Sequence, residues 1–195
     1  MVPLAQAQNV PRPAEFYFDQ DATATRALSA QRGEGDALVN RLIRQIERDP
    51  RAWEAMAQLG QLAMDGGRED TGRGFYDRAI AGAGAQHGAS RRLRWHYGWS
   101  LYRSGDAQAA LTQWASLIDG PLRAQWLPPT MALALWKLDH KDQAVAWYAA
   151  AARTEPSVWA SPTDLAALLP DWREQERADL LEVQRAWAAN PPAWP

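Results

Sequence analysis

Along the middle of the chain, apolar and small residues recur every three or four positions, and short turns interrupt these stretches. The spacing is typical of helices that bury one face. Gly67 and Gly105 mark two of the turns, because glycine allows the backbone conformations that a tight turn needs. Asp106, directly after the second turn, is expected to cap the next helix, and Pro156 is expected to end a later one. The pattern predicts an all-α protein made of helix pairs.

These helix pairs repeat with a nearly constant period. A small residue, a turn residue, a second small residue and an aromatic residue follow at fixed spacing in three units: Gly60, Gly67, Gly72 and Tyr76; Gly98, Gly105, Ala110 and Trp114; Ala132, Asp139, Ala144 and Tyr148. The last two units lie 34 positions apart and the first two 38, because a Gly-rich joint at 82–90 adds four residues. The first small residue allows the two helices to approach closely, and the aromatic residue fills the space between units. The predicted core thus includes the three aromatic residues and, in an earlier degenerate unit, Leu42.

The order of small residue, turn, alanine, aromatic residue, alanine and proline resembles the tetratricopeptide repeat (TPR) family. The last unit matches it best, with Ala132, Ala144, Tyr148, Ala151 and Pro156. The unit before it departs from the pattern at Leu117 and Leu122. A further unit at 19–52, N-terminal to the three above, is degenerate, with Arg26 at the small position. The longer Gly-rich step also resembles related helical-hairpin repeats of longer period. The resemblance implies a right-handed superhelical array of antiparallel helix hairpins, a TPR-like solenoid, with a C-terminal capping helix.

The predicted organisation places the repeats in the middle of the chain. It comprises an extended or disordered leader (1–18), TPR-like repeats at 19–158 (19–52, 53–90, 91–124 and 125–158), a degenerate repeat with the capping helix (159–190) and a Pro-rich tail (191–195). Residues 161–164 predict a capping box that begins at Ser161. Residues 171–190 predict an amphipathic helix whose charged side would face solvent, as the end of such an array requires.

The resemblance also implies where a partner would bind, because the first helix of each pair lines the concave face of the array. The implied inward positions are Arg92, Trp95, Trp99, Tyr102 and Arg103 in the third unit and Trp126, Leu133, Trp136 and Lys137 in the fourth. Those of the second unit, Glu54 and Gln61 among them, are smaller or polar. Trp, Tyr and Arg dominate binding hot spots. We therefore expect a peptide or partner segment to bind in an aromatic, basic-rimmed groove.

Two alternatives stay open for these aromatic residues. The chain's own helix at 171–190 or its tail would cover them if the protein is a structural scaffold, and a second copy would cover them in a homo-oligomer. The family's carboxylate clamp for chaperone C-termini is not expected here. Trp95 and Trp99 stand where that clamp has lysine and asparagine.

Composition argues against several other functions. Lys and Arg number 21 against 23 Asp and Glu, a net charge of −2, so no nucleic-acid partner is expected. No apolar run reaches the ~18 residues of a membrane span, so no membrane insertion is expected. Cysteine is absent, and the three histidines lack partners at metal-ligand spacing. Because no nucleophile–base motif occurs either, we expect no catalytic, metal or cofactor site and no enzyme activity.

One short pattern near the N-terminus bears on the compartment. Ala5 and Ala7 form the small-x-small pattern of a signal-peptidase site, although no basic or apolar region precedes them. One interpretation is a periplasmic or otherwise exported protein, working in a bacterial cell-envelope assembly. The other is a cytoplasmic protein with an ordinary N-terminus.

Overall fold

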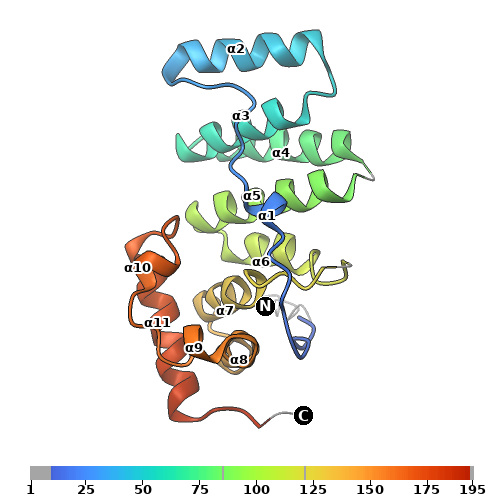
Figure 1. Cartoon of the computed structure of the whole chain (residues 1–195). Helices are drawn as coiled ribbons and strands as arrows, with labels where there is room; N and C mark the ends of the chain where they lie inside the picture. The colour runs from blue at the N-terminus through green and yellow to red at the C-terminus, as the bar shows by residue number, and fades with distance from the viewer. Residues whose placement is uncertain (1–9, 85, 121, 194–195) are drawn as a thin grey trace, which may run out of the picture. The chain divides into compact units, whose positions relative to one another are not determined.

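The computed structural model describes residues 10–84, 86–120 and 122–193, and helices dominate them (Figure 1). The helices are α1 (Ala22–Thr25), α2 (Gly35–Arg48), α3 (Trp53–Asp65), α4 (Glu69–Ala83), α5 (His87–Arg103), α6 (Ala107–Ala115), α7 (Leu127–Lys137), α8 (Lys141–Thr154), α9 (Pro156–Trp159), α10 (Leu165–Leu168) and α11 (Glu174–Ala189). The predicted all-α class is confirmed, with helices packed in adjacent pairs. The superhelical form of the array stays a prediction.

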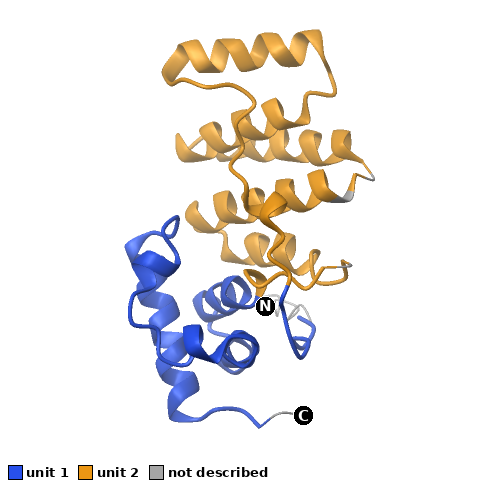
Figure 2. Cartoon of the chain, in the orientation of Figure 1, with its two compact units in different colours: residues 1–18, 128–195 blue, residues 19–127 orange. Residues whose placement is uncertain are grey.

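The chain divides into two compact units (Figure 2). Unit 2 comprises residues 19–127, and unit 1 comprises residues 1–18 together with 128–195. The division separates the inward residues of the predicted fourth repeat from those of the third, except for Trp126, which belongs to unit 2.

Unit 2 is a stack of helices that pack on their neighbours in the sequence. Helix α2 packs on α3, α3 on α4, α4 on α5 and α5 on α6, while the short α1 packs on α5. Leu38 and Leu42 of α2 meet Ala55 and Leu59 of α3 in one apolar cluster. Leu42, Tyr76 and Trp114 are fully buried, as their places in the repeat predict.

Small residues at the predicted places let the helices of unit 2 approach closely. A Cβ added to Gly98 would overlap the indole of Trp114, and one added to Gly60 would lie 2.9 Å from Cδ2 of Tyr76. The predicted turns at Gly67 and Gly105 have φ angles of 73° and 99°, which favour glycine. Asp106 caps α6, its side chain accepting a hydrogen bond from the Ala109 N–H at 2.9 Å, as expected.

Unit 1 has its own aromatic core around α8. The Tyr148 ring lies 5.8 Å from that of Trp187 on α11, and its hydroxyl donates to the Trp159 carbonyl at 2.7 Å. Tyr17 is buried, with its ring 5.9 Å from the Trp147 ring and its N–H donating to Thr154 Oγ1 at 3.1 Å. The end of the predicted leader therefore contributes to a core.

The helix ends of unit 1 differ in detail from the prediction. Asp164, not Ser161, caps α10, because the helix begins at Leu165 and only the Asp164 carboxylate reaches the N–H groups of Ala166 and Ala167. Helix α11 begins three residues later than the predicted helix and ends one residue earlier.

Two predictions concern the protein's location: export, and no insertion into a membrane. Ala5 and Ala7 lie outside the described residues, so the predicted export stays a prediction. In the part of the chain that the structure describes, no helix is both long enough and apolar enough to cross a bilayer.

Candidate functional site

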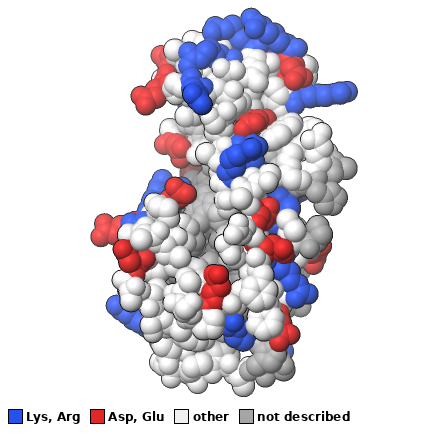
Figure 3. Space-filling view, viewed as in Figure 1, with Lys and Arg blue, Asp and Glu red and all other residues white. Residues whose placement is uncertain are grey.

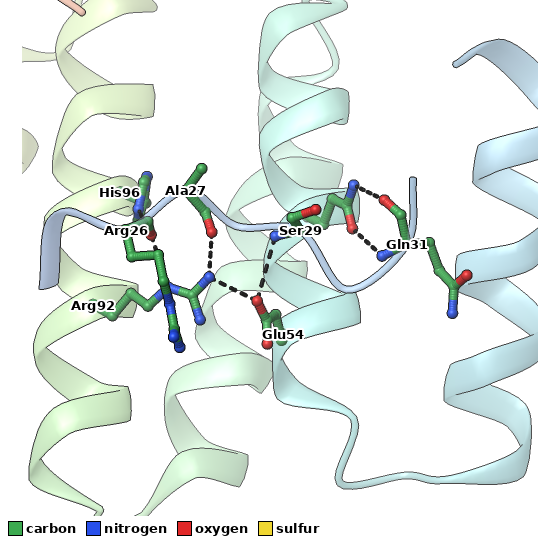
Figure 4. A network of polar contacts seen from close by, with 8 residues as sticks. Arg26, Ala27, Ser29, Gln31, Glu54, Arg92 and His96 are labelled. Carbon is green, nitrogen blue, oxygen red and sulfur yellow. Dashed lines mark hydrogen bonds and ion pairs between the residues drawn. The ribbon is translucent and has the colours of Figure 1, made fainter. Parts of the chain in front are cut away.

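A non-helical segment between α1 and α2 lies across α5 and α3 within unit 2 (Figure 4). We call residues 26–31 the strap. They are bound chiefly through their main-chain atoms. The side chains that bind these atoms come from Glu54 and Gln58 on α3 and from Arg92 and His96 on α5.

Helix α5 binds the first part of the strap through its carbonyl groups. Arg92 Nε donates to the Arg26 carbonyl at 2.8 Å, and Arg92 Nη2 donates to the Ala27 carbonyl. His96 Nε2 lies 2.9 Å from the Arg26 carbonyl oxygen. The guanidinium can therefore engage two successive peptide groups at once.

Helix α3 binds the second part of the strap. Glu54 Oε1 accepts from the Ser29 N–H at 3.3 Å. The Gln58 side chain binds both main-chain polar groups of Gln31. Its Oε1 accepts from the Gln31 N–H at 3.0 Å, and its Nε2 donates to the Gln31 carbonyl at 2.9 Å. The helices thus bind main-chain groups at residues 26, 27, 29 and 31, and the last three of these follow the two-residue spacing of an extended chain.

From residue 27 to residue 30 the side chains of the strap alternate between exposed and more buried positions. Leu28 is 6% exposed, and Ala30 packs against the apolar cluster between α2 and α3. Ala27 and Ser29, between them, are exposed. Gln31 also donates from its Nε2 to Gln45 Oε1 at 2.8 Å. The surface therefore selects an apolar side chain at one position and leaves its neighbours free.

Two buried arginines at the start of α5 pair with groups of unit 2. Arg92 forms an ion pair with Glu54 at 2.7 Å, and only 3% of the Arg92 side chain is exposed. Arg91 pairs with Asp21 at 2.8 Å and donates to the Leu117 carbonyl at 3.1 Å. A buried charge needs such partners to offset its lost hydration. Arg92, predicted to lie on the basic rim of a partner groove, instead contacts Glu54 and the strap.

The structure brings the other predicted residues of unit 2 together in one aromatic cluster. Ring centroids lie 4.3 Å apart for Trp95 and Trp126, 5.7 Å for Trp95 and Trp99, and 6.1 Å for Trp99 and Tyr102. The Arg103 guanidinium lies 4.8 Å from the Trp99 ring centroid, a cation–π contact. Trp95 and Trp99 are each only 7% exposed, whereas Tyr102, Arg103 and Trp126 are half-buried. Much of the predicted aromatic surface is therefore packed within the protein.

The three predicted residues of unit 1 have different environments. Leu133 is fully buried and Lys137 is exposed. Trp136 is half-buried, its Nε1 donates to Glu182 Oε2 on α11 at 3.1 Å, and Lys141 Nζ lies 3.6 Å from its ring centroid. Trp136 is thus in contact with the C-terminal helix that the scaffold alternative invoked.

Charge is unevenly distributed over the visible face (Figure 3). Basic side chains gather over the α2 end of unit 2, and both signs are mixed elsewhere on that face. Among the described residues no group of His, Asp and Glu is placed to hold a metal ion.

The residues of α3 that bind the strap are not among the predicted site residues. The repeat register places Glu54 on the inner face, and Gln58 has no place in the repeat pattern. A sequence signal exists, because Glu54 and Gln58 lie four positions apart, on one face of a helix that is apolar except for Gln61 and Asp65.

No protein-family model, curated protein or solved structure matches this chain significantly. The resemblance to TPR proteins therefore rests on the residues quoted above.

Proposed function

We propose that this chain is a TPR-like protein–protein interaction module, without enzyme activity, that binds an extended segment of a partner protein. The observation that carries the proposal is the set of main-chain hydrogen bonds from Glu54, Gln58 and Arg92 to the strap. Every peptide offers the same main-chain groups, so these side chains can bind segments of varied sequence.

The geometry at Gln58 supports recognition of extended chains. A primary amide offers one acceptor and two donors. Here it satisfies the N–H and the carbonyl of a single residue, as a neighbouring strand does when a peptide adds to a sheet. Arg92 and Glu54 continue this row toward the N-terminal end of the bound segment. Together they bind main-chain groups at Arg26, Ala27, Ser29 and Gln31, and these hydrogen bonds do not depend on which side chains the segment carries.

The half-buried residues of the aromatic cluster extend the proposed surface. Tyr102, Arg103 and Trp126 are the members of that cluster that keep accessible area. Large, stiff aromatic side chains and arginine give contact area at low entropic cost. We propose that they contact parts of the partner beyond the extended segment, and that Lys137 and Trp136 do so in unit 1.

Peptide binding to a variant with a loosened strap tests the proposal. The Leu28→Ser substitution in the full chain removes the buried apolar contact of the strap, and a fluorescein-labelled peptide of residues 22–32 is then titrated by fluorescence anisotropy. We expect saturable binding. Adding Gln58→Ala should weaken it about tenfold, since two hydrogen bonds worth about 0.5–1.5 kcal/mol each are lost. Gln61→Ala, on the same helix without a strap contact, should leave it unchanged.

A structural scaffold is the second candidate, and one observation favours it. Trp136 donates a hydrogen bond to Glu182 of α11, so part of the predicted surface is occupied by the chain itself. A scaffold of this kind would bind no peptide in either the Leu28→Ser chain or its Gln61→Ala derivative. That outcome would favour the scaffold over the peptide-binding module.

A further inference from the structure

The strap occupies the surface that the proposed function requires. Glu54, Gln58 and Arg92 are all hydrogen-bonded to residues 26–31 of the same chain. A partner segment cannot use these groups while the strap does. Either the surface serves only to fold the N-terminal segment, or the strap leaves when a partner binds.

We propose that the strap is a displaceable internal ligand that restrains binding, and that the partner supplies an extended segment with a large apolar side chain at the place of Leu28. This inference rests on the proposed function and adds to it a regulation and a ligand class. The partner segment takes the same main-chain hydrogen bonds as the strap, with a small residue at the place of Ala30.

The contacts of the strap define this ligand class. Leu28 is the one residue of 26–31 that is buried, and Ala30 is half-buried against the cluster between α2 and α3. Residues 26, 27 and 29 are exposed, so their side chains place few limits on the ligand. The partner motif is therefore one large apolar residue, followed two positions later by a small one, in an extended stretch.

The ends of the strap show how it can leave without unfolding the helices. On its C-terminal side Gly33, within the link to α2, and Gly35, the first residue of α2, have φ angles of 118° and 59°, so this joint includes two residues with unusual backbone freedom. On its N-terminal side α1 is only four residues long and is tied to α5 by the Asp21–Arg91 pair. Release of the strap between these points breaks its main-chain hydrogen bonds and exposes Leu28, but no helix of the stack must open.

Tethering gives the strap an advantage over a free peptide. A segment joined to its site by a short link has an effective concentration in the millimolar range. A free peptide with the same contacts must compete with it. In the wild-type chain we therefore expect peptide binding at least about tenfold weaker than in a chain whose strap is loosened.

The experiment compares full-length chains in one titration. The probe is the labelled peptide of residues 22–32, with a second peptide carrying Leu28→Ser as its control. The proteins are wild type, Leu28→Ser and Gln31→Pro. Gln31→Pro removes the Gln31 N–H without changing a fully buried side chain. It replaces Leu28→Ser as the loosened chain if circular dichroism shows that Leu28→Ser does not fold.

The expected result is weak binding to wild type and binding at least about tenfold tighter to the loosened chains, with the Leu28→Ser peptide bound at least tenfold more weakly than the native one. Equal affinity for wild type and loosened chains would overturn the restraint, while leaving peptide binding itself established. Equal affinity for the two peptides would overturn the ligand class. If neither loosened chain binds the peptide, the proposed function is contradicted together with this inference.

A second copy of the chain is the competing occupant. If straps exchange between copies, the wild-type protein should form dimers at high concentration in sedimentation experiments, and Leu28→Ser should abolish them. That result would overturn the assignment of the surface to a partner segment.

Discussion

At the scale of single residues, the close approach of α5 and α6 depends on Gly98. A Cβ at this position would overlap the Trp114 indole, which is fully buried and donates from Nε1 to the Trp95 carbonyl at 3.2 Å. We expect Gly98→Ala to lower the free energy of unfolding by about 1–3 kcal/mol, because the indole or the helix must shift. Urea denaturation followed by tryptophan fluorescence measures this change.

Gly74→Ala is the matched control for that substitution. Gly74 is exposed in the interior of α4, and nothing lies within 4 Å of an added Cβ. Alanine favours a helix over glycine by about 0.5–1 kcal/mol, so this variant should be slightly more stable than wild type. A Gly98→Ala protein as stable as Gly74→Ala would contradict the packing described at Trp114.

The residues that could be predicted from the sequence are those whose role depends on local spacing. Gly67, Gly105 and the aromatic residues Tyr76 and Trp114 were placed correctly because a repeat imposes the same neighbours at the same distance along the chain. Asp139 has a φ of 63° at the place where the earlier turns have glycine, which the period also predicts. The strap could not be found in this way. Its contacts use main-chain groups, which every residue has, and they join positions 25 to 70 residues apart.

At the scale of elements, Asp106 joins two helix pairs. Its carboxylate caps α6 and accepts from Arg73 Nη2 of α4 at 2.8 Å. Partial burial tends to raise the pKa of this carboxyl group, but the hydrogen bonds from Ala109 and Arg73 and the charge of Arg73 lower it below its ordinary value of 3.8. The stabilisation is therefore complete above about pH 4 and is lost as pH falls through the lowered pKa.

This arrangement predicts a pH-dependent difference between two variants. Asp106→Asn keeps an acceptor for the cap but loses the ion pair, so it should cost about 0.2–1 kcal/mol at neutral pH and progressively less as pH falls below about 4. Asp106→Ala also loses the cap and should cost about 1 kcal/mol more. Thermal unfolding between pH 3 and pH 7 measures both. A cost of Asp106→Asn that grows toward low pH would contradict the assigned direction of the pKa shift.

At the scale of the whole molecule, local stability should vary along unit 2. The stack from α3 to α6 is held by broad apolar contacts, whereas α1 and the strap are held by polar contacts and by two buried apolar side chains, Ala24 and Leu28. Segments of the second kind open with lower free energies than the core. The low free energy of opening that would let a partner displace the strap also makes this opening measurable without a ligand.

The Asp21–Arg91 pair gives the sharpest measure of that opening. Both side chains are more than nine-tenths buried, so Asp21→Asn leaves the Arg91 charge without its counter-ion, a change that costs about 3–5 kcal/mol when such a pair is fully buried. Because α1 and the strap can detach and let water reach Arg91, we expect the cost to appear as local opening. Hydrogen exchange of the Ser29 and Gln31 amides should accelerate at least tenfold, while α3 and α4 exchange as in wild type. Equal acceleration throughout unit 2 would show that the segment is an inseparable part of the core, and would contradict its release.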